Sequence, residues 1–182
     1  MAKIPESKII KTPAFTNPRL LLDSNVPKPL HGINPRTVLG KAWWDVERKK
    51  ASKKNNNCCY ACGVHRSEAK YHPWMEGHES YAINYAVGNM RLKEIVSLCH
   101  SCHNFIHSGR LQNLYDKGEI SPSKYHDITA HGLNLTKRFC APKRPEYIQQ
   151  DWSKWHLVIN GKKYYSKFKN VVEWSRHYGS NS

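Results

Sequence analysis

The feature that most constrains the fold of this 182-residue chain is a pair of Cys-x-x-Cys knuckles. The first knuckle contains Cys59 and Cys62, the second contains Cys99 and Cys102, and 36 residues separate them. Each knuckle is a tight turn that directs two sulfur atoms toward one point, so four thiolates can complete a tetrahedral shell around Zn²⁺. A thioredoxin-like redox motif is the alternative for a single Cys-x-x-Cys, but two of them in one chain favour a structural zinc site.

Two histidines follow the second knuckle. His103 comes directly after Cys102, and His107 follows four residues later. If this segment is helical, residues four apart lie on one face, and both imidazoles can reach a single ion. Shells of histidine and carboxylate with an open position are those in which a metal acts on water or phosphate. We therefore expect a second divalent ion here, such as Mg²⁺, Mn²⁺, Ni²⁺ or Zn²⁺.

The composition indicates a polar globular chain. The mean hydropathy is −0.73, and no apolar run approaches the length of a membrane span. Residues 1–8 contain no apolar segment typical of a signal peptide. We expect a protein of the cytoplasm that does not bind a membrane, and in that reducing compartment paired cysteines bind metal more often than they form disulfides.

The net charge of +15 is unevenly distributed. Residues 1–58 contain 12 Lys and Arg against 4 Asp and Glu, and residues 110–182 contain 13 against 6. Residues 59–109 contain 4 of each class. Basic flanks around a neutral segment suit a polyanion that the flanks hold and the centre receives, so the expected partner is nucleic acid, DNA in the first instance. A protein partner stays open, as does the oligomeric state.

Four stretches around the knuckles resemble a known family. They are Cys59, Cys62 and Gly63; Met75-Glu76-Gly77-His78-Glu79-Ser80; Ile95-Val96-Ser97-Leu98-Cys99; and Cys102-His103 with Ile106-His107. Together they resemble the HNH endonucleases, in which two strands and a helix hold a divalent ion (the ββα-metal or His-Me finger), often braced by a four-cysteine zinc site. The likeness covers roughly Trp43 to Gly109, about a third of the chain. It suggests a divergent phage or prophage member.

The resemblance implies an α+β fold with a small ββα-metal finger core, braced by the four-cysteine zinc and carrying basic helical and hairpin appendages. We expect five segments: an extended Pro-rich arm at 1–33, a basic amphipathic helix at 34–57, the HNH-like zinc core at 58–109, a helical extension at 110–140, and a basic linker, β-hairpin and C-terminal helix at 141–182. Asn34-Pro35 predicts the start of the basic helix. Asn160-Gly161 predicts a type I′ hairpin turn, and strands are expected within 70–83 and 91–98.

Catalytic roles follow from the resemblance residue by residue. His78 is the candidate for the strand histidine that activates water as a general base. The family places a metal ligand directly before this base. If the pair is His78-Glu79, the base position holds Glu79, and if His78 is the base, the ligand position holds Gly77. Glu94 occupies the position usual for Asn. The implied ligands of the catalytic ion are His103, His107, Glu76 and Glu94.

The predicted function is that of an HNH-type metal-dependent endonuclease that hydrolyses phosphodiester bonds. The candidate phosphate contacts are Lys49, Lys50, Lys53, Lys54, Lys143, Arg144, Lys162, Lys163, Lys167 and Lys169. The alternative is a catalytically degenerate module with the same scaffold that binds nucleic acid or a protein, for example as an adaptor or inhibitor encoded by a mobile element. The departures at Gly77, Glu79 and Glu94 favour the alternative, and the retained histidines favour the enzyme.

Overall fold

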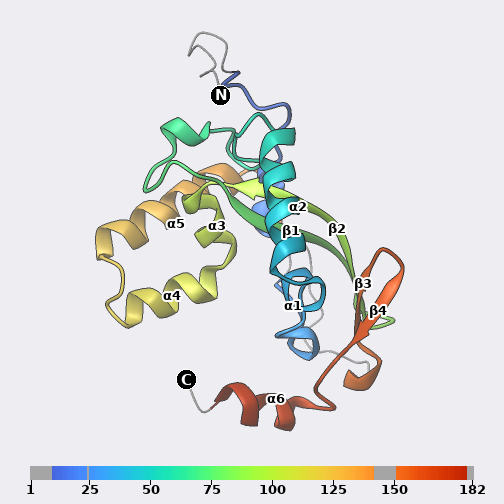
Figure 1. Cartoon of the computed structure of the whole chain (residues 1–182). Helices are drawn as coiled ribbons and strands as arrows, with labels where there is room; N and C mark the ends of the chain where they lie inside the picture. The colour runs from blue at the N-terminus through green and yellow to red at the C-terminus, as the bar shows by residue number, and fades with distance from the viewer. Residues whose placement is uncertain (1–9, 24, 142–150, 180–182) are drawn as a thin grey trace. The chain divides into compact units, whose positions relative to one another are not determined.

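The computed structural model describes residues 10–23, 25–141 and 151–179, which form six α-helices and one four-stranded sheet (Figure 1). This confirms an α+β fold. The chain divides into two compact units: unit 1 contains Met1–Asp23, Arg48–His78 and Ile95–Ala141, and unit 2 contains Ser24–Glu47, Glu79–Glu94 and Pro142–Ser182. In the described part of the chain, no helix combines the length and apolar character that crossing a membrane requires.

Two consecutive strands lead into the helix that carries the second knuckle. Strand β1 (Glu76–Asn84) and strand β2 (Asn89–Leu98) are neighbours in the sheet, whose order is β1-β2-β3-β4. Only residues 85–88 connect them. This connection is too short for a crossover between parallel strands, so the two strands form a hairpin. Helix α3 (His100–Ile106) follows at once, with Cys99 as its N-cap. The second knuckle therefore lies at the junction between strand and helix.

The first knuckle is a hydrogen-bonded turn attached to the end of β2. The Cys59 N–H donates to the Val64 carbonyl (2.8 Å), and the Gly63 N–H donates to the Cys59 carbonyl (2.9 Å). Gly63 has φ +80°, a conformation that side chains disfavour, so glycine suits this position. The Tyr60 N–H donates to the Ser97 carbonyl (2.7 Å). Because Ser97 directly precedes Leu98 and Cys99, this bond brings the two knuckles together.

The core of unit 1 lies around the knuckles. Helices α4 (Ser108–Asp116) and α5 (Pro122–Thr136) follow α3, and α5 packs against it so closely that a Cβ on Gly132 would overlap the Phe105 ring. A 3₁₀ helix at Pro18–Leu22 buries Leu20 and Leu21 against the same core. Within the arm predicted at 1–33, two short 3₁₀ helices, this one and Lys28–Leu30, provide anchors through buried leucines.

The basic helix forms in two pieces. Helix α1 (Pro35–Leu39) starts as predicted, in a capping box in which the Thr37 N–H donates to the Asn34 side chain (2.9 Å). Gly40, with φ +88°, then ends α1, and α2 (Lys41–Lys54) begins anew. The prediction of one continuous helix was wrong because Gly40 adopts a conformation outside the helical region. On α2, the apolar Val46 is 50% exposed.

Unit 2 is built on the predicted hairpin. Strands β3 (His156–Ile159) and β4 (Lys162–Tyr165) pair antiparallel, and β3 adds in parallel to β2 through the pairs from Asn89↔His156 to Arg91↔Val158. Asn160 (φ +49°) and Gly161 (φ +79°) both have positive φ, as a type I′ turn requires. The buried core consists of Leu30, Ile33, Met90, Trp155, Leu157 and Ile159. Helix α6 (Val171–Tyr178) is the last helix of the described chain.

Candidate metal centres

The four knuckle cysteines converge in unit 1. Their sulfur atoms all lie within 4.8 Å of one another, and Cys62 Sγ lies 3.7 Å from Cys99 Sγ. Two thiolates bound tetrahedrally to one zinc at about 2.3 Å would be separated by about 3.8 Å. Cys59, Cys99 and Cys102 are buried and Cys62 is half-buried. The group is therefore compatible with a structural metal such as zinc, because both the donor set and the spacing fit one.

Two neighbouring residues support this group without joining it. His131, on α5, places its Nε2 3.3 Å from Cys102 Sγ, where an N–H can donate to a thiolate. Cys58 is adjacent in sequence to Cys59, but its thiol donates to the Lys11 carbonyl (3.4 Å), and its burial raises its pKa. Cys58 is thus held as a neutral thiol apart from the metal group.

Three imidazoles form a second group in unit 1. His78 comes from β1, His103 from α3, and His107 is the residue between α3 and α4. One ligand atom from each lies within 4.8 Å of the others, and the three ring pairs have centroid separations of 4.8, 5.0 and 5.6 Å, all edge to face. His107 departs from helical geometry (φ −96°, ψ 47°), and α4 starts at the next residue. This is where α3 ends, so the ring is presented at the helix terminus.

The state of these rings suits metal binding. Burial lowers the pKa of His78 to about 3, and the nearby His107 and His103 add to the effect. Burial also lowers the pKa of His107, with smaller contributions from His103 and Arg110. Among the described residues, no partner accepts or donates a hydrogen bond at the buried His78 Nδ1. Neutral rings with free lone pairs are the form in which histidine binds a metal, so the donor set fits a divalent ion.

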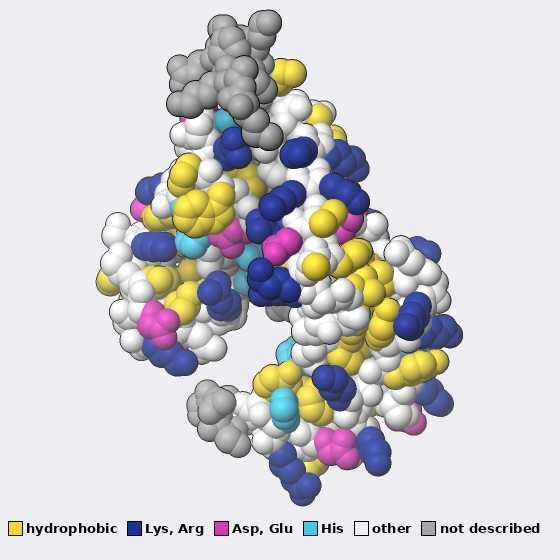
Figure 2. Space-filling view, viewed as in Figure 1, with side chains coloured by type: hydrophobic (Ala, Val, Ile, Leu, Met, Phe, Trp, Pro, Cys, Tyr) yellow, Lys and Arg dark blue, Asp and Glu magenta, His cyan; other side chains and the backbone are white. Residues whose placement is uncertain are grey.

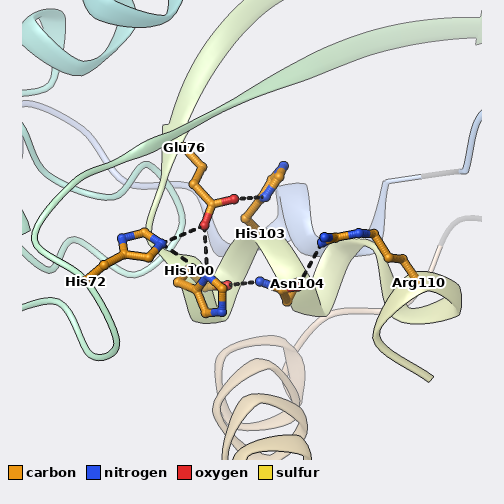
Figure 3. Close-up of polar contacts among 6 residues, drawn as sticks. All are labelled: His72, Glu76, His100, His103, Asn104 and Arg110. Carbon is orange, nitrogen blue, oxygen red and sulfur yellow. Dashed lines mark hydrogen bonds and ion pairs between the residues drawn. The ribbon is translucent and has the colours of Figure 1, made fainter. Parts of the chain in front are cut away.

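Glu76 lies beside the three-histidine group and contacts one of its members. Figure 3 shows Glu76, the first residue of β1, with Oε2 paired to Nδ1 of His103. Burial would raise the pKa of this carboxyl, but hydrogen bonds from His100 and His103 outweigh it and keep the pKa well below its usual range. A carboxylate that accepts from Nδ1–H fixes the tautomer that leaves Nε2 free for an ion. Glu76 is thus placed to orient His103.

The other predicted site residues are dispersed. Among the described residues, neither Glu79 nor Glu94 belongs to a group of converging metal ligands, and each is half-buried with interactions of its own. The predicted phosphate contacts on α2, Lys49, Lys50, Lys53 and Lys54, are exposed, as are Lys162, Lys163, Lys167 and Lys169 in unit 2. Lys143 and Arg144 lie outside the described residues. The basic linker therefore stays a prediction.

Three histidines that the structure brings to these groups were not predicted from the sequence. His131 supports Cys102, while His72 and His100 converge on Glu76. The side chain of His100 is only 20% exposed. No spacing rule connects these residues, because they come from α5, from the loop before β1 and from α3. The sequence offered one indication only: His100 lies inside the second knuckle, close to metal ligands. It offered none for His72 or His131.

Comparison with known proteins adds no relative. No protein-family model matches the chain, and neither a curated protein nor a solved structure matches it. Function is therefore inferred from the residues and from their geometry.

Proposed function

We propose that the chain is an HNH-type nuclease, a metal-dependent enzyme that hydrolyses phosphodiester bonds of nucleic acid, with DNA as the expected substrate. The observation that carries the proposal is the convergence of His78, His103 and His107, with ligand atoms within 4.8 Å of one another. The order of elements supports it, because β1 and α3 supply His78 and His103, His107 follows directly after α3, and β2 connects the two beside a four-cysteine group, in the order that a ββα-metal finger would use.

The three histidines divide two tasks between them: holding the ion and activating the attacking water. An ion at this group would supply charge stabilisation at a phosphate oxygen and lower the pKa of a coordinated water. His103 and His107 would hold it, and Glu76 fixes the ring of His103 through Nδ1. His78 is neutral at physiological pH, because burial lowers its pKa to about 3, so its lone pair is available to the ion or to a proton of the attacking water.

The basic surface supports nucleic acid as the substrate. Figure 2 shows Lys and Arg side chains over much of the visible face, with fewer acidic side chains among them, in agreement with the net charge of +15. Exposed lysines occur at the C-terminal end of α2 and on β4. Such side chains bind phosphates without reading bases, so we expect affinity that falls steeply with salt and has little sequence preference.

The test is nicking of supercoiled plasmid by the purified chain, with Mg²⁺, Mn²⁺, Ni²⁺ or Zn²⁺ added in turn. We expect metal-dependent nicking that His78→Ala and His107→Ala each reduce by at least about 100-fold, the scale of a lost catalytic group. His126→Ala is the matched control, because His126 is an exposed histidine of α5 outside the metal groups. Full activity in His78→Ala or His107→Ala would contradict the proposal.

A second candidate is the scaffold without catalysis. Two observations favour it. Among the described residues, the three-histidine group contains no carboxylate, and Gly77, directly before His78, has no side chain that could bind a metal. This candidate predicts no nicking with any of the four ions, together with DNA binding that weakens with salt and is unchanged in His78→Ala. The same plasmid assay, paired with a binding titration, therefore separates the two candidates.

A further inference from the structure

His72, Glu76 and His100 form a compact triangle of donor atoms next to the three-histidine group (Figure 3). His72 Nε2 and His100 Nδ1 each lie 2.9 Å from the same oxygen, Glu76 Oε1, and 3.1 Å from each other. Ligand atoms held tetrahedrally at about 2.0–2.1 Å from zinc are separated by about 3.3 Å. The donor atoms of the triangle are thus slightly closer to one another than the ligands of a zinc ion, and a small outward movement of each would make room for one.

Hydrogen bonding alone cannot satisfy all three contacts of the triangle. If both facing nitrogens carry a proton, each can donate to Glu76 Oε1, but then two N–H groups oppose each other across the 3.1 Å contact. If only one is protonated, the other nitrogen directs a lone pair at a carboxylate lone pair at 2.9 Å. A cation bound by all three lone pairs removes the conflict, because each donor then faces positive charge.

The surrounding structure holds the three side chains in place. Tyr71, directly before His72, has φ +83°, which is uncommon for a residue with a side chain and is kept only where the surrounding structure enforces it. Its ring packs edge to face on His100 (5.3 Å). The His72 ring stacks flat on Trp74, with centroids 3.8 Å apart and an interplanar angle of 2°. Side-chain exposure of only 12% for His72, 23% for Glu76 and 20% for His100 shields the donors from water.

The geometry points to a second histidine–carboxylate metal site made of His72 Nε2, Glu76 Oε1 and His100 Nδ1. Two imidazoles and one carboxylate suit Zn²⁺ or a similar borderline ion, and they leave one position open. Glu76 joins this site to the three-histidine group, because its Oε1 faces the triangle while its Oε2 contacts His103 Nδ1. Binding at the triangle therefore holds the carboxylate that orients His103. Glu76 is in this sense a positioning residue.

The number of Zn²⁺ ions bound per chain tests the site. Protein purified without chelator, so that unit 1 keeps its structural metal, is dialysed to equilibrium against buffered Zn²⁺, and its zinc content is measured by atomic emission. Three ions are expected for the wild type: one each at the cysteines, the three histidines and the triangle. His72→Ala is expected to bind two, His107→Ala two, and the double variant one. His126→Ala, the matched control, keeps three. His72 lies outside both knuckles, so its substitution spares the cysteine ligands.

A measurement on the wild type guards against a variant that fails to fold. Long-range ¹H–¹⁵N NMR of the histidine rings is recorded as Zn²⁺ is added, and we expect His72 Nε2 and His100 Nδ1 to shift while the other nitrogen of each ring keeps its proton. Unchanged shifts at these two atoms after three equivalents, or equal zinc content in folded His72→Ala and wild type, would overturn the site. Neither readout depends on nuclease activity, so a failed plasmid assay leaves this test intact.

Discussion

The two units of this chain differ in the interactions that stabilise each of them internally. Unit 1 has its sulfur and imidazole groups at the centre, and its apolar core is formed in part by the ligand cysteines Cys59, Cys99 and Cys102. Unit 2 has a core of aliphatic side chains around Trp155, and none of the three metal-ligand groups found among the described residues lies in it. Cross-linking by an ion replaces buried apolar area in small folds. Unit 1 should therefore depend on metal and unit 2 on packing.

The largest expected effect is the loss of unit 1 when metal is removed. Structural zinc contributes on the order of 10 kcal/mol to the folding of small zinc-stabilised peptides, which is comparable to the whole net stability of a typical domain. We expect a chelator, or Cys99→Ser, to abolish amide-exchange protection in α3 and α5, while β3 and β4 stay protected. Hydrogen exchange followed by mass spectrometry of peptides from each unit measures this.

Cys140→Ser is the control for that experiment, because Cys140 is exposed and belongs to no metal group among the described residues. Its exchange pattern should match that of the wild type. If chelation removed protection from β3 and β4 as completely as from α3, the two units would unfold as one, and the contrast between them would not hold.

The parts of unit 1 that could be predicted from sequence are those encoded by local spacing. Cys59 and Cys62, like Cys99 and Cys102, are adjacent on a turn whatever the rest of the fold, so the cysteine group could be expected from the spacing alone. The hairpin at Asn160-Gly161 is similar, since two residues determine its turn. His103 and His107 were likewise placed by their spacing around the end of one helix.

What could not be predicted depends on contacts between distant segments. His72 and His100 are separated by 28 residues and meet only because the loop before β1 lies beside the start of α3. Glu76 was assigned to the catalytic ion because it lies close to His78 in sequence. Residues two apart on a strand share a face, but this does not determine which partner each of them contacts. The break at Gly40 was visible in the sequence, yet a single glycine in a helical pattern does not by itself end a helix.

The second effect in size concerns the packing of unit 2. Trp155 is fully buried, its indole lies 3.3 Å from where a Cβ on Gly88 would be, and Tyr85 packs on it edge to face at 5.8 Å. Trp155→Ala should cost about 3–5 kcal/mol, the usual range for truncating a buried Trp. We expect lost exchange protection in β3 and β4 with the zinc content of the chain unchanged.

Trp155→Phe sharpens the same comparison. No residue in the described part of the chain accepts a hydrogen bond from Trp155 Nε1, so the smaller ring removes a buried unpaired donor while keeping most of the packing. Trp155→Phe should therefore lower the free energy of unfolding clearly less than Trp155→Ala does. Zinc release caused by either substitution would show that packing in unit 2 supports the metal groups, contrary to the expected independence of the two units.

The smallest effect is a pH dependence within unit 2 that involves no metal. His31 accepts a hydrogen bond at Nδ1 from the Trp174 indole N–H (3.1 Å), and its Nε2–H donates to the Val26 carbonyl (3.0 Å). Burial lowers the pKa of His31, and the positive charge of Lys28 adds to this, although the bond to Val26 opposes it. Protonation would put a hydrogen on Nδ1, facing the indole donor, and would break the contact with α6.

The sign of the pH effect follows from the lowered pKa. Below about pH 6.5, the ordinary histidine value, the unfolded chain takes up the proton before the folded chain does, so stability is complete above that pH and declines as the pH falls toward the folded pKa. The loss is small, because the ring is only half-buried and solvent screens its charge. Exchange in α6 should therefore accelerate modestly between about pH 7 and about pH 5, after correction for the intrinsic rate. His31→Gln keeps an acceptor and a donor but cannot titrate, so it should remove the dependence. An equal acceleration in this variant would show that His31 is not the group responsible.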